Sequence, residues 1–140
     1  MRWRNRFRKP RPARRWPQFR SKYLCPCCGL PTLNARSNYY ICSICFWEDD
    51  GQDDADAGDV RGGPNHDYSL TEARANFAAH LTMYRSSDTR PFERDTAYNG
   101  HKAQVIAQLR CAVQSRRLGD WRKALRAKAV YEVQLYAGMR

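Results

Sequence analysis

Cysteines carry the clearest chemical signal in this sequence, since five of the six lie between residues 23 and 47. Cys25 and Cys28 form one Cys-x-x-Cys pair, Cys42 and Cys45 form a second, and thirteen residues separate the two pairs. Two cysteines spaced in this way sit on one tight turn, which directs both sulfurs at a single point. Two such turns are typical of a zinc site with four thiolate ligands. We therefore predict one structural Zn²⁺ ion bound by these four cysteines.

Two other kinds of cysteine chemistry are alternatives. The run Cys25-Pro26-Cys27-Cys28 is superficially like the motif of a thiol oxidoreductase. Such motifs open a helix, whereas Gly29-Leu30-Pro31 follows here, which disfavours a redox enzyme. A disulfide scaffold needs an oxidising compartment, and no export signal is recognisable. A catalytic zinc would keep one coordination position open, which a complete set of four cysteines does not provide.

The remaining two cysteines have no place in this ligand set. Cys27 lies between two ligands and is expected to point away from the metal as a small packed residue, although a reactive thiol or a substitute ligand stays an alternative. Cys111 is expected to lie in the core on the inward side of a helix. Neither residue is needed to complete the zinc site.

The metal is also expected to hold its own segment together. Leu33 and the run Tyr39-Tyr40-Ile41 favour β structure, so we expect a short hairpin that carries one cysteine pair near each end. This segment contains few aliphatic residues from which to build a core. Zinc binding can contribute ~10–16 kcal/mol to the folding of such a segment.

Residues 69–140 favour helices. Ser69 followed by Glu72 is a capping box, and an apolar face follows it. A second helix is expected at about 101–117, and a third should start at the Gly119-Asp120 break, with Asp120 as its N-cap, and end at Gly138. The residues expected to face inward are Leu70, Ala73, Phe77, Leu81 and Tyr84 in the first helix, Val105, Ile106, Leu109 and Val113 in the second, and Leu118, Trp121, Leu125, Ala129, Val133 and Tyr136 in the third.

Four ordered blocks of sequence resemble the bacterial cysteine-rich CPCC family. The blocks are Cys25-Pro26-Cys27-Cys28-Gly29, then Tyr40-Ile41-Cys42-Ser43-Ile44-Cys45-Phe46-Trp47-Glu48-Asp49-Asp50, then Gly62-Gly63-Pro64-Asn65, then Ser69-Leu70-Thr71-Glu72-Ala73-Arg74-Ala75-Asn76-Phe77. The resemblance covers about residues 23–80, and it departs from the family pattern at Ser43, where the family usually has Pro. It implies a small zinc-ribbon-like module for which no activity is established.

An acidic segment follows the second cysteine pair, at residues 48–68. No register of these acids gives a calcium-binding loop, so a solvated loop or a contact site for a protein partner is expected. Trp47, just before the segment, is expected to cover the zinc ribbon, or to anchor an interface if it is exposed. The candidate partner-binding residues are Trp47, Glu48, Asp49 and Asp50.

The positive charge of the chain is concentrated at its N-terminus. Lys and Arg number 25 against 14 Asp and Glu, a formal net charge of +11, and residues 1–22 hold ten of the basic residues and no acid. Arginines contact phosphates and aromatic rings stack on unpaired bases, so this tail suits nucleic acid, although a solvated leader stays an alternative. The candidate nucleic-acid contacts are Arg2, Arg4, Arg6, Arg8, Arg14 and Arg15 in the tail and Arg122 and Arg126 in the last helix.

Several classes of protein are excluded or disfavoured. No apolar run approaches the ~20 residues of a membrane span. The start lacks the apolar stretch of a secretory signal, and prolines interrupt the helix that a transit peptide would form. A cytoplasmic location is therefore expected. No catalytic triad, P-loop, nucleotide fingerprint or HExxH motif is present, so neither enzymatic activity nor a small-molecule substrate is expected.

These observations predict an α+β protein with a single small core. We expect a disordered Arg-rich tail at 1–22, a zinc-binding module with the acidic loop and first helix at 23–85, and a helical extension at 86–140 that brings the helices to about three. The predicted function is a non-enzymatic zinc-binding module that binds a protein partner, for example as an accessory or toxin-neutralising protein. A nucleic-acid-binding zinc ribbon is the alternative.

Overall fold

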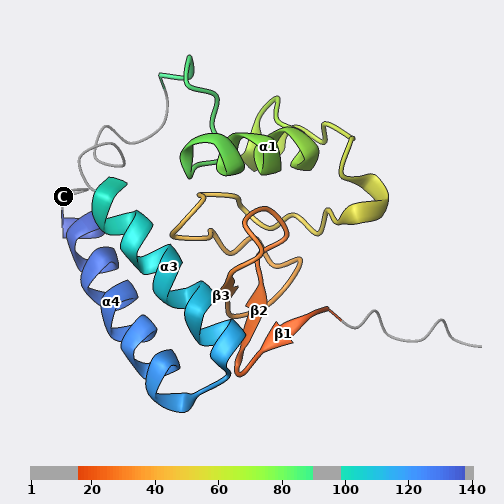
Figure 1. The fold of residues 1–140 in the computed structure, drawn as a ribbon. Helices are drawn as coiled ribbons and strands as arrows, with labels where there is room; N and C mark the ends of the chain where they lie inside the picture. The colour runs from red at the N-terminus through yellow and green to blue at the C-terminus, as the bar shows by residue number, and fades with distance from the viewer. Residues whose placement is uncertain (1–15, 90–98, 138–140) are drawn as a thin grey trace, which may run out of the picture.

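The computed structural model describes residues 16–89 and 99–137. In chain order, its elements are strands β1 (Gln18–Phe19), β2 (Lys22–Leu24) and β3 (Pro31–Leu33), the short 3₁₀ turns η1 (Asp54–Asp56) and η2 (Gly63–Asn65), and helices α1 (Leu70–His80), α3 (Asn99–Ser115) and α4 (Leu118–Ala137). Figure 1 shows α3 and α4 side by side as an antiparallel pair, with the sheet beside their lower half and α1 across the top. The predicted α+β class and helical C-terminal half are confirmed.

The sheet is antiparallel in the order β1-β2-β3, and it departs from the predicted hairpin. The strands that pair are β2 and β3, which flank the first cysteine turn, and only an isolated bridge between Ile41 and Glu48 flanks the second. Each cysteine pair therefore has its own turn. Strand β1 and the start of β2 fall within the predicted tail, and Phe19 packs edge-on against Trp121 of α4, so the boundary predicted at residue 22 is too late.

Helix α1 begins as predicted and ends earlier. The Ser69 hydroxyl accepts a hydrogen bond from the backbone N–H of Glu72 at 3.1 Å, which confirms the N-cap. Leu81 takes a left-handed conformation (φ 67°), and its N–H bonds the Phe77 carbonyl, so the helix stops there and Tyr84 lies beyond it. The buried ammonium of Lys102 donates to the Leu81 carbonyl at 3.0 Å, which ties α3 to this helix end.

The α3–α4 turn differs from the predicted one. Helix α3 ends at Ser115, and Arg116 takes a left-handed conformation (φ 58°), so the chain breaks before the predicted Gly119-Asp120 position. Helix α4 begins at Leu118, which places Gly119 and Asp120 within its first turn, so the prediction of Asp120 as N-cap is wrong. The Ser115 hydroxyl donates to the Asp120 carboxylate at 2.6 Å and accepts from the Arg117 N–H at 3.2 Å, and it closes the turn instead.

The buried faces of the last two helices are only partly those predicted. In α3, Val105, Ile106 and Leu109 are buried as expected, whereas Val113 and Cys111 are exposed. In α4 the buried side chains are Trp121, Ala124, Tyr131 and Leu135. Of the stripe that the sequence suggested, Leu118, Val133 and Tyr136 are exposed. Trp121 belongs both to the predicted stripe and to the buried face. From Ala129 onward, the residues of the predicted stripe lie on the solvent side of α4. None of the described helices is long and apolar enough to cross a membrane.

Stability measurements can test this helix orientation. Leu135→Ala removes a buried side chain and is expected to lower the free energy of unfolding by about 2–5 kcal/mol. Val133→Ala changes a side chain that is 69% exposed and should have an effect within about 0.5 kcal/mol. Urea unfolding of the metal-loaded protein measures both values. A larger loss of unfolding free energy in Val133→Ala than in Leu135→Ala would show that Val133 is buried, as the sequence predicted.

Candidate metal centre

The four predicted ligands lie close together around one position. The sulfur atoms of Cys25, Cys28, Cys42 and Cys45 all lie within 4.8 Å of one another. The Cys25 and Cys45 sulfurs are 3.6 Å apart, and those of Cys28 and Cys42 are 3.7 Å apart. Sulfurs at the corners of a tetrahedron about 2.3 Å from a central zinc would be separated by about 3.8 Å. The cluster therefore has the dimensions of a site for one tetrahedral metal ion.

Both cysteine turns are built in the same way. In the first, the Gly29 N–H bonds the Cys25 carbonyl at 2.8 Å, and Gly29 takes a left-handed conformation. In the second, the Phe46 N–H bonds the Cys42 carbonyl at 2.8 Å, and Phe46 takes the same conformation with φ 70°. This conformation suits glycine but costs energy for a residue with a side chain. The second turn is therefore held by its surroundings, in which Phe46 is buried beneath Lys102 and beside Tyr84.

Comparison with known proteins supports the same site. The family model described as cysteine-rich CPCC matches residues 23–95, just over half of the chain. The chain belongs to the cysteine-rich CPCC family. No curated protein and no solved structure matches it.

Thr32 completes the surroundings of the CPCC cysteines. Its hydroxyl lies 3.0 Å from the Cys42 sulfur, where it can donate a hydrogen bond to a thiolate. Thr32 is on β3, immediately after the first cysteine turn, so the register of the β2–β3 pair places it. Sequence analysis missed this residue because a threonine in a strand carries no signal of such a contact.

Burial and mutual contact divide the four thiols into two kinds. Burial raises the pKa of Cys25, Cys28 and Cys45 well above the ordinary value. Burial would also raise the pKa of Cys42, but hydrogen bonds from the other three thiols and from Thr32 outweigh this effect and hold it well below the ordinary value. Without a metal, Cys42 is therefore the residue of the CPCC cluster that becomes a thiolate most readily, and Cys25, Cys28 and Cys45 hold their protons more tightly.

Cys27 is buried but lies outside the four-sulfur cluster. Its contact with the Cys45 sulfur lowers its pKa, but burial and the neighbouring Cys25 and Cys42 charges together raise the pKa above the ordinary value. A buried thiol with a raised pKa is a poor nucleophile. The geometry therefore favours the packing role for Cys27 over the role of a reactive thiol.

The second cysteine turn is attached directly to helix α4. The Ser43 hydroxyl donates to the Glu132 carboxylate at 2.7 Å, and the Tyr131 hydroxyl donates to the Ser43 carbonyl at 3.1 Å. Partial burial, followed by the negative charges of Glu132 and Cys42, raises the pKa of Tyr136. These links place the C-terminal half of α4 against the metal centre. No sequence pattern indicates them, because the partners are 88 and 89 residues apart.

The four candidate partner-binding residues differ in exposure. Trp47 and Asp49 are fully buried, and the Asp50 side chain is 7% exposed, which leaves Glu48 as the one with more surface. Asp49 accepts hydrogen bonds from Arg36 Nε at 2.8 Å and from the Ser37 N–H at 2.7 Å. In this arrangement, Trp47 and Asp49 stabilise the loop around the second cysteine turn and present no surface to a partner.

Most carboxylates of the acidic segment form ion pairs within the chain. Four arginines pair with its carboxylates or with those near α1: Arg36 with Asp49 and Asp53, Arg61 with Asp50 and Asp56, Arg74 with Asp53 and Asp54, and Arg85 with Asp67 and Glu72. Hydrogen bonding by the Asp53 backbone, with a further contribution from Arg61, lowers the pKa of Asp56. Most carboxylates of the segment therefore serve contacts within the protein, as in a structural element.

The candidate nucleic-acid residues fall into two groups. Arg122 and Arg126 are exposed on α4. The tail residues Arg2, Arg4, Arg6, Arg8, Arg14 and Arg15 lie outside the described residues.

The protonation states give a quantitative prediction for metal binding. Zinc binds thiolates, so it must displace about three protons, from Cys25, Cys28 and Cys45. These raised pKa values mean that protons compete more strongly as the pH falls. The logarithm of the apparent zinc association constant should rise by about three per pH unit from about pH 6 to 7.5, as measured by competition with a chelator.

A variant of a cysteine outside the cluster is the control for this measurement of zinc affinity. Cys111→Ser should leave the slope and the affinity unchanged, because Cys111 is exposed and lies outside the cluster. A slope of about four in the unmodified protein would contradict the assignment of a thiolate to Cys42.

Proposed function

We propose that this protein is a non-enzymatic module whose structural zinc ion positions a surface for binding another protein. The observation that carries the proposal is the closed set of four cysteine sulfurs, three of them buried, at separations that suit tetrahedral zinc. An all-thiolate tetrahedral set favours zinc or iron, and a complete set leaves no position for substrate or activated water. When bound, the zinc would neutralise the thiolates and fix the two turns.

A reducing compartment is part of this proposal. Four cysteine ligands must stay reduced to bind a metal, and none of the six cysteines forms a disulfide. The cytoplasm is the usual compartment for such a site.

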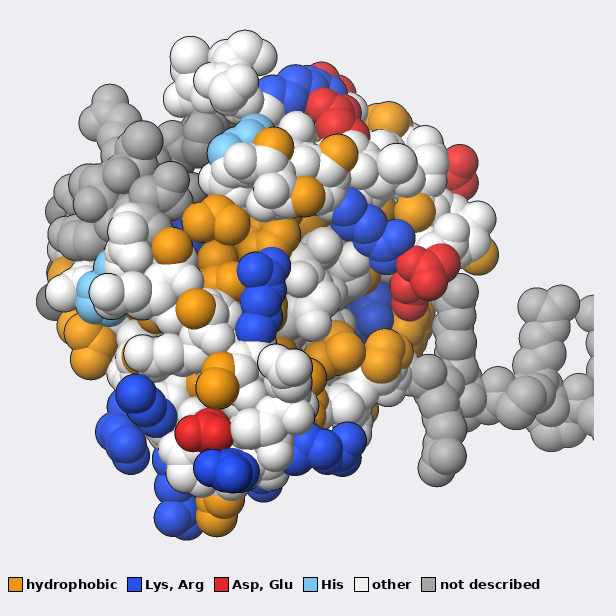
Figure 2. All heavy atoms as spheres, in the orientation of Figure 1, with side chains coloured by type: hydrophobic (Ala, Val, Ile, Leu, Met, Phe, Trp, Pro, Cys, Tyr) orange, Lys and Arg blue, Asp and Glu red, His pale blue; other side chains and the backbone are white. Residues whose placement is uncertain are grey.

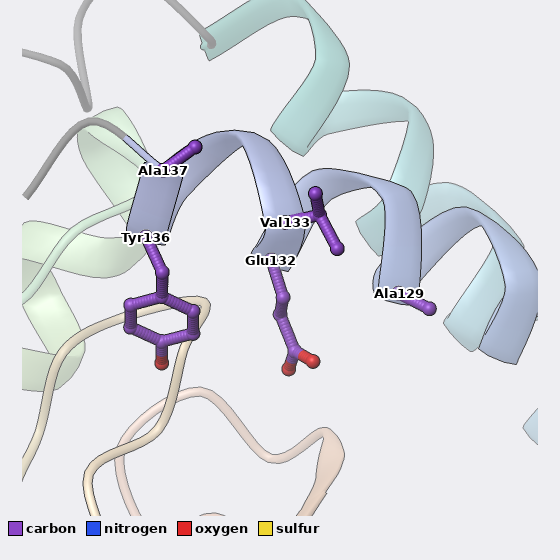
Figure 3. Close-up of a pocket in the computed structure, with 5 residues that line it drawn as sticks. All are labelled: Ala129, Glu132, Val133, Tyr136 and Ala137. Carbon is purple, nitrogen blue, oxygen red and sulfur yellow. The ribbon is translucent and has the colours of Figure 1, made fainter.

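The surface that we assign to the protein partner is the outer face of the C-terminal half of α4. Val130 is 51% exposed, Val133 69% and Tyr136 49%, and they form an apolar strip with Ala129 and Ala137. Figure 3 shows Glu132 and Tyr136 pointing to one side of the helix and Ala129, Val133 and Ala137 spaced along it. These residues line an open hollow of about 640 Å³. An exposed apolar strip of this kind is typical of an interaction site.

The occupant is expected to be a different protein and not a second copy. The strip spans only about two helical turns, which is too small for the ~800 Å² per partner of a stable dimer interface. Pairing two copies here would also bring two strongly positive helical halves together, since residues 101–140 contain nine basic and two acidic residues. A partner segment with apolar side chains bordered by Asp or Glu fits both features. An accessory or toxin-neutralising protein would use a surface of this kind.

The metal part of the proposal is tested by elemental analysis of protein purified under reducing conditions. We expect one zinc per chain, lost in Cys42→Ser together with cooperative thermal unfolding, and retained in Cys111→Ser. Iron in place of zinc, or a metal-free protein with an unchanged melting temperature, would refute the zinc assignment.

The binding surface is tested by placing an aspartate either within the apolar strip or at a control position outside it. Val133→Asp should abolish capture of the partner from nuclease-treated lysate of the source cell, because it puts a carboxylate in the centre of the apolar strip. Ala107→Asp puts the same charge on the exposed side of α3 and should leave capture intact. Quantitative mass spectrometry of the captured proteins compares the two variants. Equal capture by both would show that the strip is not the binding surface.

Nucleic acid is the second candidate ligand. The observation that favours it is the set of exposed arginines and lysine around the α3–α4 turn, none of which has an acidic partner among residues 16–89 and 99–137.

A further inference from the structure

Six cations from three elements gather at one end of the molecule. Arg20 lies in the β1–β2 turn, Arg116 and Arg117 in the α3–α4 turn, and Arg122, Lys123 and Arg126 in the first half of α4; we call these six residues the turn cluster. The Arg20 guanidinium donates to the Arg116 carbonyl at 2.9 Å, which brings the two turns together. Figure 2 shows blue side chains along the lower edge, where Figure 1 has the α3–α4 turn.

The turn cluster lacks the ion pairs that the arginines of the CPCC module form. All six side chains are exposed, and none forms an ion pair with a residue that the structure describes. The nearby carboxylate of Asp120 is instead bonded by the Ser115 hydroxyl. By contrast, Arg36, Arg61, Arg74 and Arg85 of the CPCC module each pair with two carboxylates. Positive charge is therefore left unbalanced at this one end.

Helix stabilisation accounts for only part of the turn cluster. Arg116 and Arg117 follow the C-terminus of α3, where a cation interacts favourably with the helix dipole. Arg122 and Lys123 lie near the positive N-terminal end of α4, where the dipole gives a cation no stabilisation. Arg126 lies one turn beyond Arg122, about 6 Å along the helix axis. The charge on α4 therefore points to a ligand.

The composition of the cluster indicates which ligand it is. The aromatic rings beside the cluster are already packed, which disfavours single strands: Trp121 is buried, and Phe19 packs edge-on against Trp121 with the Arg20 guanidinium over its ring. Leu118, 46% exposed, is the large apolar side chain that lies between these cations, whereas the core of a protein interface would present several. Apart from Leu118, the large exposed apolar residues of α4 (Val130, Val133 and Tyr136) follow the cations along the axis instead of lying beside them, unlike the arrangement in a helix on a membrane surface.

We propose that the turn cluster binds the phosphate backbone of a nucleic-acid duplex, without reading its bases. Guanidinium groups suit phosphate oxygens in geometry and charge, and a duplex carries one negative charge per about 1.7 Å of its axis. Binding depends on counterion release, so it weakens steeply with salt. This second surface lies at the opposite end of α4 from the apolar strip, and it stands independently of the protein partner.

The test compares two variants of the full-length, zinc-loaded chain that lose the same charge. One carries Arg122→Gln, Lys123→Gln and Arg126→Gln in the turn cluster, and its control carries Arg2→Gln, Arg4→Gln and Arg6→Gln in the tail. Fluorescence anisotropy with labelled 20-base-pair DNA and RNA duplexes, over a range of salt concentrations, measures affinity and salt dependence. Circular dichroism confirms that both variants are folded.

The cluster variant should bind the duplexes at least tenfold more weakly, and its slope of log K against log salt should fall by about two to three. The tail control should lose less than threefold. Equal losses in the two variants would overturn the proposal, because net charge alone would then explain binding. Binding to a 20-residue polyglutamate peptide or to phosphatidylserine vesicles that matches or exceeds duplex binding, with the same dependence on the cluster, would also overturn it.

Discussion

The fold depends on bringing four cysteine sulfurs into contact within the protein interior. Four thiolates at these distances repel one another, and burial adds a further cost, so without a metal three of them stay protonated. The surroundings are arranged around this constraint: two turns with left-handed residues at equivalent positions, and a hydroxyl at one sulfur. The rest of the CPCC half contains little regular structure, which is why a metal has so much to contribute to it.

Arginine–carboxylate pairs hold the loops that the metal does not reach. Asp49 is fully buried, and it joins the Arg36 guanidinium to the backbone of Ser37 and Gly51. A buried pair of this kind is costly to break, because removing one member leaves the other charged and uncompensated. The acidic character of residues 48–68 thus reflects contacts within the protein, whereas the exposed cations around the α3–α4 turn have no acidic partner among the described residues.

Features that depend on contacts between residues close in sequence were predictable, and features that depend on long-range contacts were not. The cysteine spacing identified all four ligands and the Ser69–Glu72 cap fixed the start of α1, because both depend on residues within one or two turns of each other. The orientation of α4 was not predictable, because Val133 and Tyr136 are as apolar as the Tyr131 and Leu135 that are buried instead. Ring contacts such as Phe19 with Trp121, and the Ser43–Glu132 bond, select the buried face, and no local pattern reveals them.

Ser43 lies in the second cysteine turn, and its hydroxyl reaches a helix that the family model does not cover. Because of this bond, metal binding at the second cysteine turn and ligand binding at α4 are thermodynamically linked. Linkage is reciprocal, so a ligand that binds α4 only in this position also raises the affinity of the turn for the metal. Loss of the metal likewise lowers the affinity of α4 for that ligand.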